Sequence, residues 1–210
     1  MILRQILELE FSIEGMLRFL SHLELQHFFS RLALRANLPV YFTQGFNPRP
    51  RISLPVPRSV GIGSWDDRAR IEMEENIDPA EAMEKLRGFV PFELEFKRAW
   101  MTEPGRLERV NAIEWQIDLD GLDPETISSR IGEILAGPVN MTRRAKKTDK
   151  EYSVDFRPLI LEMSRQENFL RAKIAYTPQG SIRPGELLEI LHLPKKEFLG
   201  RMTRIKTYWN

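Results

Sequence analysis

The feature that most constrains the fold of this chain is an order of strand and helix patterns that occurs twice along it. Strand patterns alternate apolar and polar residues or are rich in β-forming side chains, whereas helix patterns repeat their apolar residues every three to four positions. In the first half these patterns predict a strand, a helix, two strands, a helix and a strand, at residues 3–14, 21–36, 51–56, 68–75, 78–87 and 92–100.

The second half roughly repeats this order, with extra strand structure between its two helices. Helices are predicted at 123–136 and 183–191, and strands at 108–119, 139–142, 152–157, 159–163, 169–176 and 202–209. Glu103-Pro104-Gly105 separates the halves, because proline and glycine interrupt regular structure. We therefore predict an α+β fold of two ferredoxin-like (βαββαβ) halves in tandem, residues 1–104 and 105–210, packed together.

The helix predicted at 21–36 has a defined start and a defined apolar face. Ser21 followed by Glu24 has the spacing of a capping box, in which each side chain bonds the other's backbone N–H. The apolar face, which we expect to enter the core, consists of Leu25, Phe28, Phe29, Leu32, Ala33 and Ala36. Leu23 and Leu34 lie away from that face, which predicts a second packing surface for the other half or for a protein partner.

The composition excludes several kinds of site. The sequence contains no cysteine, so it has no disulfide, no thiolate metal ligand and no cysteine-bound iron–sulfur cluster. His22 and His27 diverge by about 140° on a helix, which is unsuited to a shared metal ion. We expect no metal and no cofactor. No apolar run is long enough to span a membrane and no secretory signal pattern opens the chain, so we expect a cytoplasmic protein without a membrane partner.

Residues 44–51, Gln-Gly-Phe-Asn-Pro-Arg-Pro-Arg, form the most chemically specific segment. Glycine and proline favour an irregular loop, two arginines can bind phosphate, and an aromatic ring can stack on a base. The residues that we expect to contact single-stranded RNA or a phosphorylated ligand are Gln44, Phe46, Asn47, Arg49 and Arg51. The alternative is a rigid connector whose asparagine caps a turn and whose phenylalanine packs inward.

Further basic residues are candidate RNA contacts although the net charge is only +1. Arg31 and Arg35 continue a stripe from His27 at helical spacing, and a solvated helix face is the alternative. A basic run between two predicted strands and two arginines that precede prolines complete the set, namely Arg143, Arg144, Lys146, Lys147, Arg157 and Arg183. The run could instead be a solvated loop, and the last two arginines could bond backbone atoms.

Residues 17–64 contain Phe-Leu-Ser-His-Leu, a basic helix, Gly-Phe-Asn-Pro and a Gly-x-Ser end. This pattern, with 154–159 (VDFRPL) and 181–186 (SIRPGE), resembles the radical SAM-linked family, domain of unknown function 2344. Two departures are His27, where the family more often has arginine, and Glu24, where it has aspartate. The resemblance implies RNA or ribosome biology and a radical SAM partner protein, since the radical SAM domain itself is absent. It carries no catalytic role to this chain.

We therefore expect an RNA-binding or RNA-associated accessory protein that acts with a radical SAM partner and has no activity of its own; DNA is not expected as a ligand. One alternative is a metal-independent RNA endonuclease that uses His22 as acid and base, although a structural histidine is the simpler interpretation. Another is a subunit that only binds a radical SAM enzyme, through Leu23 and Leu34.

Overall fold

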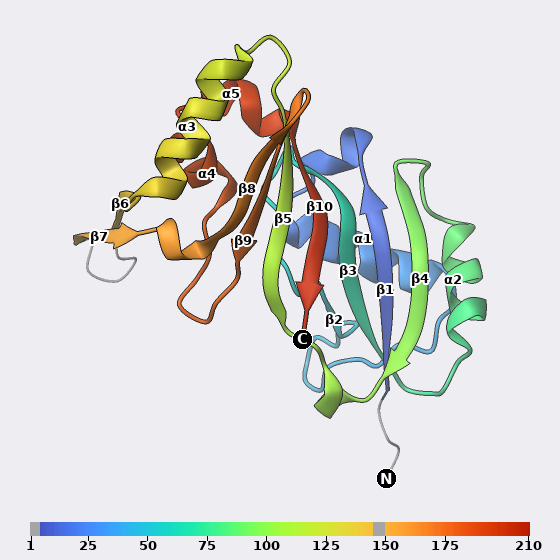
Figure 1. The fold of residues 1–210 in the computed structure, drawn as a ribbon. Helices are drawn as coiled ribbons and strands as arrows, with labels where there is room; N and C mark the ends of the chain where they lie inside the picture. Colours follow the sequence, from blue (N-terminus) through green and yellow to red (C-terminus); the bar gives the residue numbers. More distant parts are fainter. Residues whose placement is uncertain (1–4, 145–149) are drawn as a thin grey trace. The chain divides into compact units, whose positions relative to one another are not determined.

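The computed structural model describes residues 5–144 and 150–210 (Figure 1). The chain divides into two compact units, the first ending at Arg109 but including Asn210, and the second spanning Val110–Trp209. The described residues form a mixed α and β structure with five α-helices and mostly antiparallel sheets. None of the helices in this described part is long and apolar enough to cross a membrane.

The first unit has the element order that its sequence patterns predict. Its elements are β1 (Gln5–Ile13), η1 (Gly15–Phe19), α1 (His22–Arg35), β2 (Ile52–Ser53), β3 (Gly63–Met73), α2 (Pro79–Arg87), β4 (Leu94–Thr102) and η2 (Pro104–Arg106), where η marks a 3₁₀ helix. The strands neighbour one another in the order β4-β1-β3-β2, and each pairing is antiparallel. β1 therefore lies in the middle of its unit (Figure 1).

The core of the first unit lies between one face of this sheet and the two helices. Alternate β1 side chains from Leu7 to Ile13 are buried against α1 and α2. The predicted apolar face of α1 is confirmed, because five of its residues are buried and Phe28 is partly buried. The ring of Phe29 lies 4.9 Å from that of Phe11, centroid to centroid, so α1 is fixed on the sheet by a tilted aromatic contact.

Both ends of α1 follow from local sequence. Ser21 accepts a hydrogen bond from the Glu24 backbone N–H, and Glu24 accepts one from the Ser21 backbone N–H, so the predicted capping box is present. The Ser21 hydroxyl also donates to the Glu24 carboxylate at 2.6 Å, and this bond, together with the one from the Ser21 backbone N–H, holds the pKa of Glu24 below its ordinary value. At the other end Asn37 adopts the left-handed conformation, with φ of 51°, which ends the helix before Pro39.

The second unit contains the elements β5 (Val110–Asp118), α3 (Pro124–Ala136), β6 (Asn140–Arg144), β7 (Glu151–Asp155), η3 (Arg157–Leu159), β8 (Ile160–Gln166), β9 (Phe169–Ala175), α4 (Pro184–Ile190), α5 (Lys195–Phe198), η4 (Leu199–Arg201) and β10 (Met202–Trp209). Its strand neighbours are β10-β5-β9-β8, again antiparallel. β6 and β7 pair only with each other, as a separate two-stranded sheet between α3 and β8.

Several predicted details differ in the structure. β3 begins at Gly63 rather than at residue 68, and β2 covers only two residues of the predicted strand 51–56. α5 is not predicted by the sequence patterns, since four residues are too few to show a helical period. Trp65 near the start of β3 is partly exposed, and its indole N–H donates to Glu14. A tryptophan whose polar N–H has a partner at the surface can keep part of its ring in water.

Candidate nucleic-acid interface

Residues 41–51 form an irregular hairpin that projects from the first unit. The Arg51 N–H donates to the Tyr41 carbonyl and the Thr43 N–H donates to the Arg49 carbonyl, each at 2.9 Å. The Thr43 hydroxyl also accepts from the Arg49 N–H at 3.1 Å. At its base the Tyr41 N–H bonds the Glu72 carbonyl of β3 at 2.8 Å. The stem is therefore held by backbone hydrogen bonds, and the tip at 44–48 is held away from the core.

The tip presents one aromatic ring to solvent among polar groups. Phe46 is fully exposed, and Gln44, Asn47 and Arg49 are exposed beside it. Gly45 has a φ of 133°, a conformation that a side chain would strain. The connector alternative required the phenylalanine to pack inward, and it does not. An exposed ring among amide and cationic groups has the composition of a base-stacking surface.

The two hairpin arginines differ in their surroundings. Arg51 forms an ion pair with Glu72, 2.9 Å from Nε to Oε1, so its charge is largely balanced by the sheet. Arg49 makes no ion pair within the described residues, and its exposed guanidinium can meet a phosphate. Of the two guanidinium groups, that of Arg49 is therefore the better placed to bind a phosphate.

The basic stripe of α1 lies on a different flank of the helix from the hairpin. Gln26 donates from its side-chain nitrogen to the Ile52 carbonyl at 2.6 Å, which marks the flank nearest β2 and the hairpin. Arg35 follows Gln26 by nine positions, which turns it about 180° around the helix. Its guanidinium lies 5.3 Å from the ring centroid of Phe89. His27 and Arg31 are exposed on that side, so the stripe and the hairpin do not form one surface.

Two of the predicted RNA contacts, Arg143 and Arg157, use their side chains for hydrogen bonds to other residues of the second unit. Arg143 donates to both carboxylate oxygens of Glu186, at 2.9 and 2.7 Å, and to the Ser181 carbonyl. Arg157 donates to the carbonyls of Leu135 and Ile160, each at 3.0 Å. Each of these guanidinium groups therefore joins separate segments of the second unit. For Arg157 this arrangement matches the alternative interpretation, in which the arginine bonds backbone atoms.

The surroundings of Glu186 shift the pKa of its carboxyl group. Its partial burial would raise the pKa of the carboxyl group, but hydrogen bonds from Arg143 and from the Arg183 N–H outweigh that effect. The pKa of Glu186 is therefore lower than its ordinary value. The carboxylate stays charged and keeps Arg143 in place at neutral pH.

The remaining basic candidates of this unit are exposed or not described. Arg144 is exposed and lies 3.2 Å from Glu151 across the β6–β7 pair. The Arg183 side chain is exposed, while its N–H donates to Glu186 at 2.7 Å. Lys146 and Lys147 lie outside the described residues, so nothing is added to their prediction.

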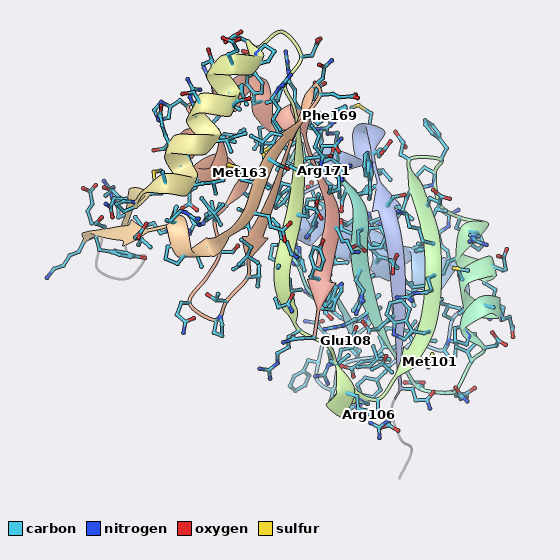
Figure 2. All side chains as sticks on the ribbon, in the orientation of Figure 1. Met101, Arg106, Glu108, Met163, Phe169 and Arg171 are labelled. Atoms are coloured by element: carbon cyan, nitrogen blue, oxygen red, sulfur yellow. The ribbon has the colours of Figure 1, made fainter. Side chains whose placement is uncertain are left out.

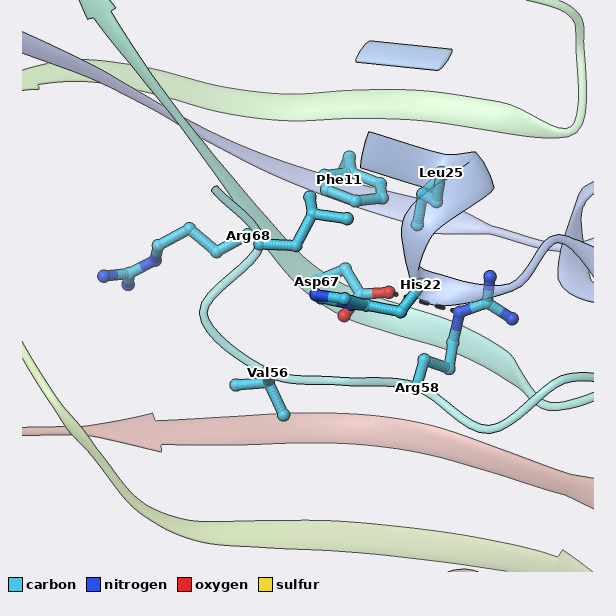
Figure 3. Close-up of a pocket in the computed structure, with 8 residues that line it drawn as sticks. Phe11, His22, Leu25, Val56, Arg58, Asp67 and Arg68 are labelled. Atoms are coloured by element: carbon cyan, nitrogen blue, oxygen red, sulfur yellow. Dashed lines mark ion pairs between the residues drawn. The ribbon is translucent and has the colours of Figure 1, made fainter. Parts of the chain in front are cut away.

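His22 is the first residue of α1 and lines a small cavity with Asp67 and Arg58 (Figure 3). Arg58 and Asp67 are buried and form an ion pair of 3.7 Å, beside which the imidazole lies. The cavity of about 10 Å³ is the size of one water molecule, which is too small for a ribose phosphate. Asp67 was missed as a neighbour of His22 because it lies 45 positions later, on another element.

Other features bear on partners and metals. Leu23 and Leu34 are exposed apolar residues on the outward side of α1, as predicted. Met16 and Phe19 of the preceding η1 turn are exposed as well. Within residues 5–144 and 150–210, no group of three or more histidine, aspartate and glutamate side chains is placed to hold a metal ion.

Fold and surface together define a class of protein: a two-unit α+β protein whose first unit carries an ordered hairpin with an exposed aromatic, amide and cationic tip. The chain belongs to the DUF2344 family of uncharacterized proteins conserved in bacteria, whose family model matches residues 7–184. The matched segment includes α1 and the whole hairpin. No curated protein matches the chain.

Proposed function

We propose that this is a cytoplasmic RNA-binding accessory protein in which the 41–51 hairpin contacts a single-stranded segment of RNA. The observation that carries the proposal is the full exposure of Phe46 at the tip of a hydrogen-bonded stem. An exposed phenylalanine keeps a large apolar surface in water, which disfavours the unbound state unless a partner covers the ring. A nucleobase is a flat partner of suitable size.

In this proposal the residues of the tip have separate roles. The Phe46 ring stacks on one base, an interaction that contributes roughly 1–3 kcal/mol and tolerates any base. Gln44 and Asn47 offer donors and acceptors to base edges. Arg49 binds the adjacent phosphate, which makes the affinity depend on salt. Arg51, already paired with Glu72, contributes less.

The proposal includes a fold assignment. We interpret each unit as a ferredoxin-like half, because each has the order β-α-β-β-α-β and a central first strand between the last and third strands. The β6–β7 pair is then an insertion in the second half. Ferredoxin-like folds serve many functions, so the fold supports the RNA assignment only by analogy and the hairpin has to carry it.

Salt-dependent binding of labelled total RNA tests the hairpin. Phe46→Ala should weaken binding by about tenfold, as expected for the loss of one stacked base. Phe92→Ala is the matched control, because Phe92 is also almost fully exposed in the first unit but outside the hairpin. Equal affinities for the wild type and both variants would remove the proposal.

A radical SAM partner protein is part of the same proposal, and the exposed apolar residues Leu23 and Leu34 support a docking surface for it on α1. Replacing both by aspartate should abolish co-purification with the radical SAM enzyme while leaving RNA binding by the hairpin intact. Unchanged co-purification would contradict this part alone.

The endonuclease alternative is less favoured, because the cavity beside His22 is too small for its substrate.

A further inference from the structure

The face of α1 that is turned away from the sheet carries a row of side chains at the spacing that helices use to pack. This row, which we name the outer seam, consists of Leu23, His27, Ser30 and Leu34. The intervals of four, three and four positions keep the side chains within about 60° of one another around the helix. In the view of Figure 2, β1, β3 and β4 lie in front of α1, so the outer seam points away from the viewer.

The outer seam is apolar and exposed at both ends and small in the middle. Leu23 is 58% exposed and Leu34 is 47% exposed, and about 16 Å of helix separates them. Between them lies Ser30, whose hydroxyl donates to the Gln26 carbonyl at 2.9 Å. This hydroxyl has its partner within α1, so it can be covered without losing its hydrogen bond. Large apolar residues on either side of a small one suit a second helix that packs across α1.

One flank of the outer seam is cationic. Arg31 and Arg35 are exposed there, and neither makes an ion pair within residues 5–144 and 150–210. The Arg35 guanidinium lies against Phe89, a ring that is itself 43% exposed, so its charge is not neutralised. The one acidic residue of α1, Glu24, accepts hydrogen bonds from the backbone N–H and the hydroxyl of Ser21 at the start of the helix. The flank therefore keeps two positive charges.

The opposite flank of the outer seam is neutral and is occupied by the first unit itself. Gln26 lies on that side, and its side-chain nitrogen donates to the Ile52 carbonyl of β2 at 2.6 Å. The two flanks therefore differ in charge. A ligand that lies along the outer seam should carry negative charge on one side only.

From this arrangement we infer that the outer seam docks an amphipathic α-helix of the partner protein, with acidic residues along one flank. The inference rests on the proposed protein-partner surface and adds the chemistry of the segment that binds there. Apolar side chains three or four positions apart on the partner helix cover Leu23 and Leu34. Its carboxylates pair with Arg31 and Arg35. A helix of about three turns spans the distance between the two leucines.

RNA is a poorer match for the outer seam. Its phosphates would meet Arg31 and Arg35, but they would leave Leu23 and Leu34 beside a charged backbone. A helical partner removes the apolar surface of both leucines from water, which favours binding, and a phosphate backbone does not. The two leucines therefore favour a protein as the occupant.

A second copy of this chain is a poorer match as well. If α1 packed on α1 of another copy, the same surface would be used twice and each copy would bring the same cationic flank. The second copy's α1 has no free carboxylate to offer, because Glu24 is bonded to Ser21. Positive charges that meet without a counter-charge disfavour the complex.

Photo-crosslinking of the full chain in cells of the source organism tests the inference. His27→p-benzoylphenylalanine places a photoreactive group at an exposed position in the outer seam, and mass spectrometry identifies what it captures. We expect a protein segment with apolar residues three or four positions apart and with aspartate or glutamate along one flank. Phe46→p-benzoylphenylalanine, at the hairpin tip, is the matched control and should not capture this segment.

Charge reversal tests the pairing. Arg31→Glu/Arg35→Glu should bind a synthetic peptide of the captured segment at least about tenfold more weakly than the wild type does. A peptide whose acidic residues are changed to lysine should restore binding to this variant. Arg49→Glu is the control, because Arg49 is also exposed and makes no ion pair in the part of the chain that the structure describes. It should bind the peptide like the wild type and lose affinity for RNA.

Four results would overturn the inference: capture of RNA, capture of a second copy of the chain, no capture, or wild-type peptide affinity in folded Arg31→Glu/Arg35→Glu. If Leu23→Asp/Leu34→Asp loses the radical SAM enzyme and the arginine variant retains it, the docking surface is kept and only its acidic helix is rejected. RNA binding that depends on Phe46, with no capture at His27, would keep the hairpin proposal and reject this inference. An acidic helix captured from another kind of protein would support the inference and reject the radical SAM partner.

Discussion

Arg143 binds Glu186 through two guanidinium nitrogens, with Nε–Oε1 and Nη2–Oε2 distances of 2.9 and 2.7 Å. Both side chains are mostly buried, and the Arg143 guanidinium carbon lies 4.5 Å from the ring centroid of Phe156. The pair ties β6 to the start of α4, across 43 positions of sequence. A bidentate pair of this geometry fixes both partners, so the arginine serves the second unit's stability.

Arg143→Ala should therefore destabilise the second unit by roughly 1.5–3 kcal/mol, because it leaves the Glu186 carboxylate without its charged partner. The free energy of unfolding in urea measures this. Arg144→Ala is the control at the next position, where the partner Glu151 is exposed and the expected loss is at most about 1 kcal/mol. Equal stability of the two variants would show that the Arg143–Glu186 pair has no structural role.

The hydroxyl group of Tyr208 should lose its proton only at an unusually high pH. Burial and the hydrogen bond from its hydroxyl to Glu114, 2.8 Å long, raise the pKa of Tyr208 to about 12 from an ordinary value of 10.0. The protonated phenol is the form that the fold favours, so its stabilising contribution is complete below about pH 10 and lost as the pH rises through about 12. Ultraviolet titration checks this, with Tyr208→Phe assigning the signal. Glu114→Gln should lower the pKa; an unchanged value would contradict the stated cause.

Phe29 and Phe92 provide a matched pair for the core of the first unit. Phe29 is fully buried against Phe11 and Phe96, whereas Phe92 is almost fully exposed. Phe29→Ala should cost about 3–5 kcal/mol of unfolding free energy, since it creates a cavity as well as losing buried apolar area. Phe92→Ala should change stability by less than about 0.5 kcal/mol. Denaturant unfolding of the two variants tests the assignment, and similar losses would be inconsistent with it.

The two hairpin arginines should differ in RNA binding. Arg49→Ala should weaken binding and reduce the slope of log affinity against log salt by about one, as for the loss of one phosphate contact. Arg51→Ala should have a smaller effect, because its charge is already balanced by Glu72. Affinities of both variants across a salt series provide the measurement. A larger effect at Arg51 would place the phosphate on the stem rather than at the tip.

Local features of this protein were predictable from its sequence. These features are the order of helices and strands, the capping box at Ser21 and Glu24, and the buried face of α1. Each depends on residues that are close together in the sequence. An irregular loop at 44–51 was also indicated locally, by its glycine and prolines. Short-range backbone preferences and apolar periodicity determine such features before distant contacts form.

Partners that are distant in sequence were decided only by the tertiary structure. Arg143 looked like part of a basic run, but chain folding places Glu186 beside it. Arg35 was predicted only as part of a basic stripe on its helix, and the tertiary structure places its guanidinium over Phe89. Glu8, Arg70 and Trp100 come together because the antiparallel register of β1, β3 and β4 aligns them. Register depends on the packing of whole strands, so a charge or an aromatic residue in the sequence does not by itself reveal what it will meet.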